Sequence, residues 1–177
     1  SDKRYIYFKS YKMDVTILRW MNASGPRQHI YPVRKFIPIV ICQAILNEDI
    51  EIYGTGNQTV DIIDVRDIAN IAIKSVRNDL GKENIIYDVG SGNAISCNDV
   101  AKFIVEKLNS KSKIRYIPMR IGEAIDTKIV AKSHSELLKK LNIKLEYSME
   151  KTLEDCINYM KSLDTKEILR AYNFFKN

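Results

Sequence analysis

Apolar and polar residues follow two different periods along the chain, and these periods predict strands and helices in alternation. Short runs of β-branched and aliphatic residues predict buried strands, at 15–18, 50–53, 59–65, 85–89 and 114–117. Apolar residues at helical spacing predict helices, at 3–12, 36–46, 67–76, in the segment after Ser96, and at 133–141, 149–162 and 165–175. Strands that alternate with helices predict a layered fold of the α/β or α+β class.

Glycine-rich segments separate several of these elements. Gly54-Thr55-Gly56 lies between two predicted strands, so a hairpin turn is expected there. The segment lacks the third glycine of a dinucleotide-binding loop and no helix follows it directly. The sequence therefore contains no dinucleotide-binding fingerprint of its own. Gly90-Ser91-Gly92 is not a GxSxG nucleophile motif, and Asn22 to Pro26 carries a loop composition, so both are predicted as turns or loops.

Composition and charge exclude several classes of protein. The 177 residues are 45% hydrophobic and 28% charged, which is ordinary for a globular protein, and no apolar run approaches a membrane span. The net charge of +6 is spread along the chain, so we expect a solvated surface with one local anion site rather than nucleic-acid or membrane binding. The three cysteines lie far apart, which indicates reduced thiols, and with no basic and apolar leader the expected compartment is cytoplasmic. Because the sequence begins at Ser1, within a helical pattern and without an initiator methionine, we expect it to be a fragment of a longer chain.

Two residue pairs could take part in catalysis or ligand binding. Tyr5 and Lys9 share a helical face, where the ammonium would lower the phenol pKa, but this spacing is common by chance in a chain rich in both residues. Arg120 and Glu123 flank a glycine outside regular structure. The guanidinium suits phosphate oxygens and the carboxylate suits vicinal sugar hydroxyls, but these residues alone leave a surface ion pair as an alternative. His29 and His134 have no metal-ligand spacing, so no metal site is expected.

Taken in order, several short motifs resemble those of one enzyme family. They are Val15-Thr16-Ile17-Leu18-Arg19-Trp20-Met21-Asn22-Ala23-Ser24-Gly25-Pro26-Arg27-Gln28, Lys35-Phe36-Ile37-Pro38, Ile52-Tyr53-Gly54-Thr55-Gly56-Asn57-Gln58, Val65-Arg66-Asp67, Tyr87-Asp88-Val89-Gly90-Ser91-Gly92, and Arg120-Ile121-Gly122-Glu123 with Asp126-Thr127. The chain, over about residues 3–162, is similar to the C-terminal half of an extended short-chain dehydrogenase/reductase. These enzymes are the NAD-dependent nucleotide-sugar epimerases and dehydratases. The motifs are most similar to those of UDP-glucose 4-epimerases and dTDP-glucose 4,6-dehydratases.

The resemblance implies a role for each matching position. Asn22 would reach the sugar diphosphate, and Ala23 would lie near the nicotinamide of NAD. Lys35 and Phe36 would open a helix whose N–H groups face the diphosphate, as a helix N-terminus favours anions in general.

The remaining implied contacts concern the nucleotide. Glu51 and Tyr53 would contact the base, largely through their backbone, while Arg120 would hold the diphosphate and Glu123 the ribose hydroxyls. The chain departs from the family at Val60. The family usually has an Arg-Asp pair at this point, in which the arginine also binds phosphate, whereas this chain has Val60-Asp61. One phosphate contact is therefore expected to be absent.

The resemblance also places the chemistry elsewhere. The glycine-rich NAD loop, the catalytic Ser or Thr and the catalytic Tyr-x-x-x-Lys belong to the N-terminal half of the family, so NAD would be bound mainly outside this sequence. Tyr5 and Lys9 would lie on the tail of the catalytic helix, and no catalytic residue is assigned in this chain. We expect this chain to be the nucleotide-sugar-binding part of a 4-epimerase. A part of a 4,6-dehydratase and a non-catalytic nucleotide-sugar-binding module are the alternatives. The isolated chain is expected to be inactive.

The implied organisation is a Rossmann-type remnant joined to a substrate-binding part. It divides into 1–32 (end of the catalytic helix, a sheet strand and a loop), 33–65 with 93–162 (substrate-binding subdomain), 66–92 (helix and strand returning to the Rossmann sheet) and 163–177 (C-terminal tail). The last strands of the sheet would lack their neighbours, so we expect association through an exposed sheet edge, as a dimer or another homo-oligomer.

Overall fold

The computed structural model describes residues 2–78, 80, 86–124 and 127–176. The helices are α1 (Asp2–Tyr11), α2 (Phe36–Leu46), α3 (Val65–Arg77), α4 (Cys97–Leu108), α5 (His134–Leu141), α6 (Met149–Lys161) and α7 (Thr165–Lys176). The strands are β1 (Ile17–Trp20), β2 (Asn22–Ser24), β3 (Ile50–Tyr53), β4 (Thr59–Asp64), β5 (Ile86–Val89), β6 (Ala94–Ser96) and β7 (Ile114–Ile117). The predicted helices and the α/β class are confirmed, whereas Ile85 and Asp126 lie outside the described residues.

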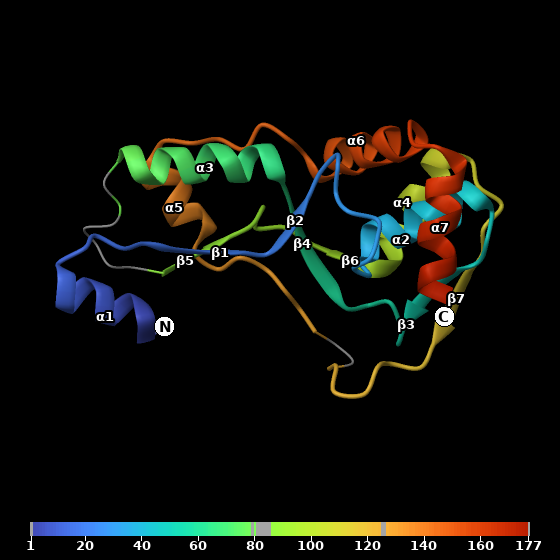
Figure 1. Ribbon diagram of the computed structural model, residues 1–177, viewed down its shortest axis with the longest axis horizontal. Helices are drawn as coiled ribbons and strands as arrows, with labels where there is room; N and C mark the ends of the chain where they lie inside the picture. Colours follow the sequence, from blue (N-terminus) through green and yellow to red (C-terminus); the bar gives the residue numbers. More distant parts are fainter. Residues whose placement is uncertain (1, 79, 81–85, 125–126, 177) are drawn as a thin grey trace.

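The strands form three small sheets, in which most pairs are parallel. β1 pairs with β5, β2 pairs with β4, and β3 pairs with β7, each in parallel, while β6 pairs antiparallel with β4. Figure 1 shows β1 and β5 beside α3 and α5, and α2, α4 and α7 at the other end of the molecule with β3 and β7. β2 and β4 run between these two regions.

The predicted hairpin at Gly54-Thr55-Gly56 is wrong. β3 and β4 belong to different sheets, so the strands on either side of this turn do not pair with each other. The turn is held instead by segments distant in sequence: Gly54 donates its backbone N–H to Ile117 (2.8 Å), and Asn98 donates to the Gly56 carbonyl (3.0 Å). Gly54 and Gly56 both have positive φ, at 68° and 74°, which turns the chain out of β3 toward the other sheet.

The predicted loop at Asn22 to Pro26 is wrong in its first half. Asn22–Ser24 is the strand β2, in which Asn22 lies opposite Ile62 and Ser24 lies opposite Asp64. Pairing with the buried strand β4 outweighs the loop propensity of these small polar residues. The preceding strand is also displaced along the chain, to Ile17–Trp20 instead of 15–18.

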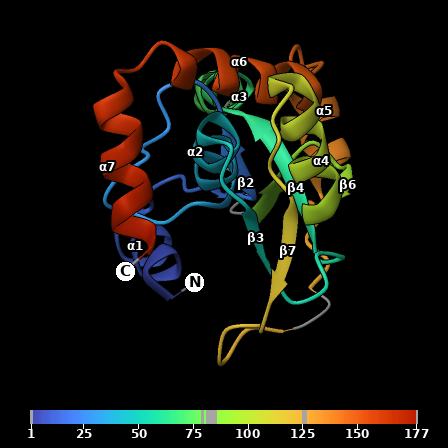
Figure 2. The same ribbon diagram turned by 90° about the vertical axis from the view of Figure 1, so that its right-hand side faces the viewer.

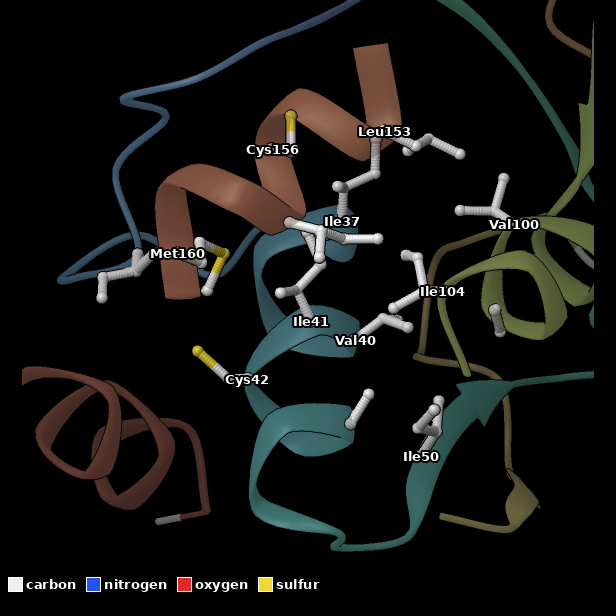
Figure 3. Close-up of a cluster of buried hydrophobic side chains, with 14 of the residues drawn as sticks. Ile37, Val40, Ile41, Cys42, Ile50, Val100, Ile104, Leu153, Cys156 and Met160 are labelled. Atoms are coloured by element: carbon white, nitrogen blue, oxygen red, sulfur yellow. The ribbon is translucent and has the colours of Figure 1, made fainter. Parts of the chain in front are cut away.

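The larger hydrophobic core surrounds α2. This helix is apolar nearly all round, as its sequence predicts, and its residues 37–44 are buried. Side chains from α4, α6, α7 and β3 pack on it, and Figure 3 shows Val40 and Ile41 of α2 facing Ile104 of α4. The predicted α6 stripe is confirmed, since Leu153, Cys156, Ile157 and Met160 are all buried in this core. The core fixes the start of α2 against β3.

A second core lies under α3 and α5. Tyr87 and Val89 of β5 pack there with Leu137 and Leu141 of α5. The sequence placed residues 133–141 in the substrate-binding part, but α5 packs against β5 and α3. The C-terminal helix α7 packs on α2, with Ile168 and Ala171 buried in the larger core, so the predicted tail is part of the fold.

A partly buried ion-pair network joins the start of α3 to α6. Asp64 caps α3 through the Arg66 N–H and accepts two further hydrogen bonds from the Arg66 guanidinium, at 2.8 and 2.7 Å. Arg66 also pairs with Asp155 at 2.8 Å, and Thr152 donates to Asp64 at 2.9 Å. Burial raises the pKa of Asp64, but the hydrogen bonds from Arg66 and Thr152 and the charge of Arg66 outweigh this effect and lower the pKa below its usual value. The arginine of the Val65-Arg66-Asp67 motif is therefore structural.

Candidate functional site

A cavity of about 190 Å³ lies where α2 begins, beside β3 and the start of α4. Five of the residues predicted to bind a ligand line it together: Phe36, Glu51, Tyr53, Arg120 and Glu123. Its other lining residues are Arg34, Ile39, Ile52, Gln58, Val60 and Cys97. Figure 2 shows how the segment that follows β7 extends from β3 and β7 before the chain returns toward α5. The lining residues come from four separate parts of the sequence, at 34–39, 51–60, 97 and 120–123.

Arg120 and Glu123 are brought together by a tight turn. Glu123 donates its backbone N–H to the Arg120 carbonyl (3.1 Å), and Gly122 between them has a φ of 88°. The two side chains form an ion pair, with 3.3 Å between Arg120 Nη1 and Glu123 Oε1, and are 51% and 50% exposed. The surface ion pair that the sequence left open is thus present. Such an exposed pair adds little stability, which leaves both groups able to bind a ligand.

The ring of Tyr53 carries two guanidinium groups. The Cζ atom of Arg120 lies 4.3 Å from the ring centroid, and that of Arg34 lies 5.3 Å from it. Both distances are in the range of cation–π contacts, which hold flexible arginine side chains in place. Sequence reasoning missed Arg34. The available signal was its position just before the predicted start of an apolar helix.

Backbone groups of β3 also face away from its partner strand. Ile50 and Gly54 donate their N–H groups to Lys113 and Ile117, both at 2.8 Å. Because hydrogen-bonding direction alternates along a strand in a parallel pair, the N–H and C=O groups of Glu51 and Tyr53 point to the opposite edge, which no described strand occupies. This edge can form backbone hydrogen bonds with the edge of a nucleotide base, as the resemblance implied for Glu51 and Tyr53.

Gln58 is a second residue that sequence reasoning missed as a ligand contact. Its side-chain Nε2 donates to the Tyr53 carbonyl (2.8 Å), and its Oε1 is buried without a hydrogen-bond partner among the described residues. The Tyr53 contact fixes the amide at the cavity wall. Its identity in the Gly54-Thr55-Gly56-Asn57-Gln58 motif was the available signal.

The start of α2 is an uncapped helix N-terminus. Lys35 is the N-cap residue, but no side chain makes a cap hydrogen bond and no acidic residue lies in the first turn. Phe36 and Ile37 therefore present backbone N–H groups that the helix cannot use, and the helix dipole adds a partial positive charge there. Phe36 lines the cavity, whereas Lys35 precedes it without lining it.

Asn22 and Ala23 lie away from this cavity. Both are on β2, opposite Ile62 and Ile63 of β4, and neither is a lining residue. Asn22 is half-buried and Ala23 is exposed. The structure thus gathers Phe36, Glu51, Tyr53, Arg120 and Glu123 at one site and leaves Asn22, Ala23 and Lys35 outside its walls.

Cys97 lies in the cavity wall at the first residue of α4. Burial raises the pKa of its thiol to about 11, so it is not a thiolate at neutral pH. Val60, on the β4 side of the same cavity, is apolar where the resemblance led us to expect arginine. The β4 wall therefore contributes no positive charge.

The part of the chain that the structure describes offers no other kind of site considered from the sequence. No group of three or more His, Cys, Asp or Glu residues there could hold a metal ion. None of the helices described is both long and apolar enough to cross a membrane. Lys9 lies on α1, and the side chain of its predicted neighbour Tyr5 is outside the described part.

Comparison with known proteins identifies what the chain is similar to. Residues 5–90 match the NAD dependent epimerase/dehydratase family. A putative UDP-glucose 4-epimerase of Methanocaldococcus jannaschii is 27% identical over 157 residues, which are 89% of this chain and 49% of that protein. A dTDP-D-glucose 4,6-dehydratase of Dictyostelium discoideum is 36% identical over 99 residues, 56% of this chain and 22% of that protein.

A solved structure has the same fold. The UDP-N-acetylglucosamine 4-epimerase of Methanobrevibacter ruminantium, in complex with UDP-N-acetylmuramic acid, superposes with a TM-score of 0.76 and 31% identity, covering 89% of this chain and 49% of that one. The chain thus spans about half the length of the two 4-epimerases compared with it.

Proposed function

Because the chain belongs to the NAD-dependent epimerase/dehydratase family, we propose that it forms the nucleotide-sugar-binding part of an enzyme of the 4-epimerase type. Such an enzyme oxidises the sugar to a 4-keto form and reduces it again on the other face. The ligand of this chain would be a UDP- or dTDP-sugar. The observation that carries the proposal is the cavity that joins Tyr53, Arg120 and Glu123 to the uncapped start of α2.

Each part of this cavity matches one part of a nucleotide sugar. The Arg120 guanidinium, which is half exposed, can donate two parallel hydrogen bonds to diphosphate oxygens. Glu123, three residues on, can accept hydrogen bonds from the two ribose hydroxyls. The edge of β3 at Glu51 and Tyr53, which no described strand occupies and where the Gln58 amide contacts the Tyr53 carbonyl, can bind the edge of the base. Phe36 and the N–H groups at the start of α2 complete the site.

We propose that NAD is not bound mainly by the residues of this chain. Ala23, the residue predicted to approach the nicotinamide, is exposed on β2 and lines no cavity with other candidate residues. In our proposal the family's cofactor is therefore held mainly by a part of the enzyme outside this sequence. The residues of this chain bind and orient the substrate, and orientation of a bound substrate contributes to the rate without direct chemistry.

Two alternatives share the same binding site. A nucleotide-sugar 4,6-dehydratase is favoured by the dehydratase relative, and a non-catalytic nucleotide-sugar-binding module is favoured by Val60 and by the absence of an assigned catalytic residue. Product analysis separates the 4-epimerase from the dehydratase. With NAD and UDP- or dTDP-glucose, a longer chain of the 4-epimerase type gives the 4-epimer, and a dehydratase gives a 4-keto-6-deoxy sugar. The module would bind without any turnover.

Calorimetric titration tests the binding proposal. We expect the chain to bind UDP or dTDP, and Arg120→Gln to weaken this binding by about tenfold or more, since a charge-assisted bidentate contact is lost. Arg19→Gln is the matched control, because Arg19 is exposed on β1, pairs with Asp88 and does not line the cavity. Equal binding by the parent chain and Arg120→Gln would contradict the proposal.

A further inference from the structure

Arg34 is the second arginine that lines the cavity. We propose that Arg34 binds a phosphate of the ligand together with Arg120, so that the site holds its diphosphate between two guanidinium groups. This inference rests on the proposed binding of a nucleoside diphosphate. It adds a residue that neither the motifs nor the family resemblance indicated.

The charges around Tyr53 support this role. Arg120 shares its charge with Glu123 at 3.3 Å, whereas Arg34 has no ion pair among the described residues. Both guanidinium groups lie within 5.3 Å of the centroid of the Tyr53 ring. Two cations held by one ring repel each other, and a doubly charged anion between them would remove that repulsion. One arginine already paired with a carboxylate would neutralise a diphosphate only in part.

The position of Arg34 in the chain also suits an anion. It precedes Lys35, the N-cap residue of α2, which has an extended backbone and no capping side chain. A phosphate that contacts Arg34 would therefore lie beside the unused N–H groups of the first turn. Guanidinium and helix N-terminus would act on the same negative charge.

The β4 wall of the cavity explains why a second arginine is needed. Val60 is the β4 residue that lines the cavity, and its side chain is apolar and partly packed against the larger core. No cation reaches the ligand from β4. We infer that Arg34, from the segment before α2, supplies this charge instead, which makes a specific rescue possible: an arginine at position 60 should replace Arg34.

The test compares ligands with and without phosphate. UDP and dTDP are titrated by calorimetry, and uridine and thymidine by ligand-observed NMR, against the parent chain, Arg34→Gln, Arg120→Gln and the control Arg19→Gln. We expect Arg34→Gln to weaken diphosphate binding by about tenfold and nucleoside binding by less than about twofold. Adding Val60→Arg to Arg34→Gln should restore diphosphate binding at least in part. Arg34 is exposed, so Arg34→Gln is expected to keep the fold, which circular dichroism checks.

The outcomes separate this inference from the proposed function. Diphosphate binding that falls in Arg120→Gln but not in Arg34→Gln would overturn the role of Arg34 and leave the proposed function intact. An equal loss of nucleoside and diphosphate binding in Arg34→Gln would show that Arg34 only positions Tyr53, and would also overturn it. A parent chain that binds neither diphosphate would overturn both.

Discussion

Ser91 donates two hydrogen bonds to the same carboxylate oxygen of Asp61, one from its backbone N–H and one from its hydroxyl, each at 2.6 Å. The other carboxylate oxygen of Asp61 accepts from the backbone N–H groups of Gly92 (3.1 Å) and Ala131 (2.9 Å). Asp61 is completely buried on β4, so it joins the turn after β5 to the segment that leads into α5. The aspartate beside Val60 is thus a structural centre and not a ligand contact.

We expect Asp61→Asn to destabilise the protein strongly. An asparagine keeps the shape but replaces one acceptor oxygen with an amide group that faces two donors, leaving buried donors unsatisfied. The expected loss is about 3 kcal/mol in the free energy of unfolding, measured by urea denaturation. Glu136→Gln, an exposed change at the start of α5, is the control. A loss below about 1 kcal/mol for Asp61→Asn would show that these hydrogen bonds contribute little to stability.

Acid should destabilise the protein through Asp64 and Asp155. The hydrogen bond from Lys151, together with Arg66, lowers the pKa of Asp155 despite its partial burial, and the pKa of Asp64 is lowered as well. In the unfolded chain an aspartate titrates near pH 3.9, so the unfolded state binds more protons in the range just below that value. The stabilisation is therefore present above about pH 4 and is lost as the pH falls through the lower pKa values of the folded state.

The variant Asp64→Asn tests this linkage by thermal unfolding between pH 2 and pH 7. We expect it to be less stable than the parent by roughly 3 kcal/mol at pH 7, since Arg66 loses a buried partner. The difference from the parent should shrink as the pH falls below about 4, because the parent then begins to lose the stabilisation that ionised Asp64 provides. A constant difference across this range would contradict the assigned pKa direction.

The three cysteines should resist alkylation in the folded protein. Burial raises the pKa of Cys42 and Cys156 to about 12 and that of Cys97 to about 11, so thiolate is scarce at pH 8. We expect slow labelling by iodoacetamide under native conditions and labelling of all three in denaturant, followed by mass spectrometry. Rapid native labelling of Cys97, which lines the cavity, would indicate a site more open than described here.

The free edge of β1 should make the chain associate. β1 pairs only with β5 among the described strands, and large apolar side chains are exposed nearby, including Tyr11 (68%) and Met13 (50%). An unpaired strand beside exposed apolar side chains favours pairing with another chain. We expect small-angle scattering to show dimers or larger species, and Val15→Lys, just before β1, to reduce them. A monodisperse monomer of the parent chain would contradict this expectation.

The sequence predicted elements whose signal is local. The helix over 36–46 was found because its apolar residues occur nearly all round, and the Arg120–Glu123 pair because the two residues are held by one turn. The hairpin was predicted wrongly because the true partners of β3 and β4 are remote: β7 lies more than 60 residues after β3, and local glycines do not reveal such a pairing. The role of Arg34 was missed for a similar reason, since a lone cation becomes informative only when Tyr53 and Arg120 are seen beside it.

The most direct test of the proposed site is an NMR titration of the ¹⁵N-labelled chain with UDP and dTDP. The largest amide shifts should occur in residues 34–37, 51–58 and 120–123, which surround the cavity. The amides of the α3–α5 region, around Ile71 and Leu137, should not change. Shifts confined to that second region, or none with either nucleotide, would contradict the central claim that this cavity binds the nucleoside diphosphate.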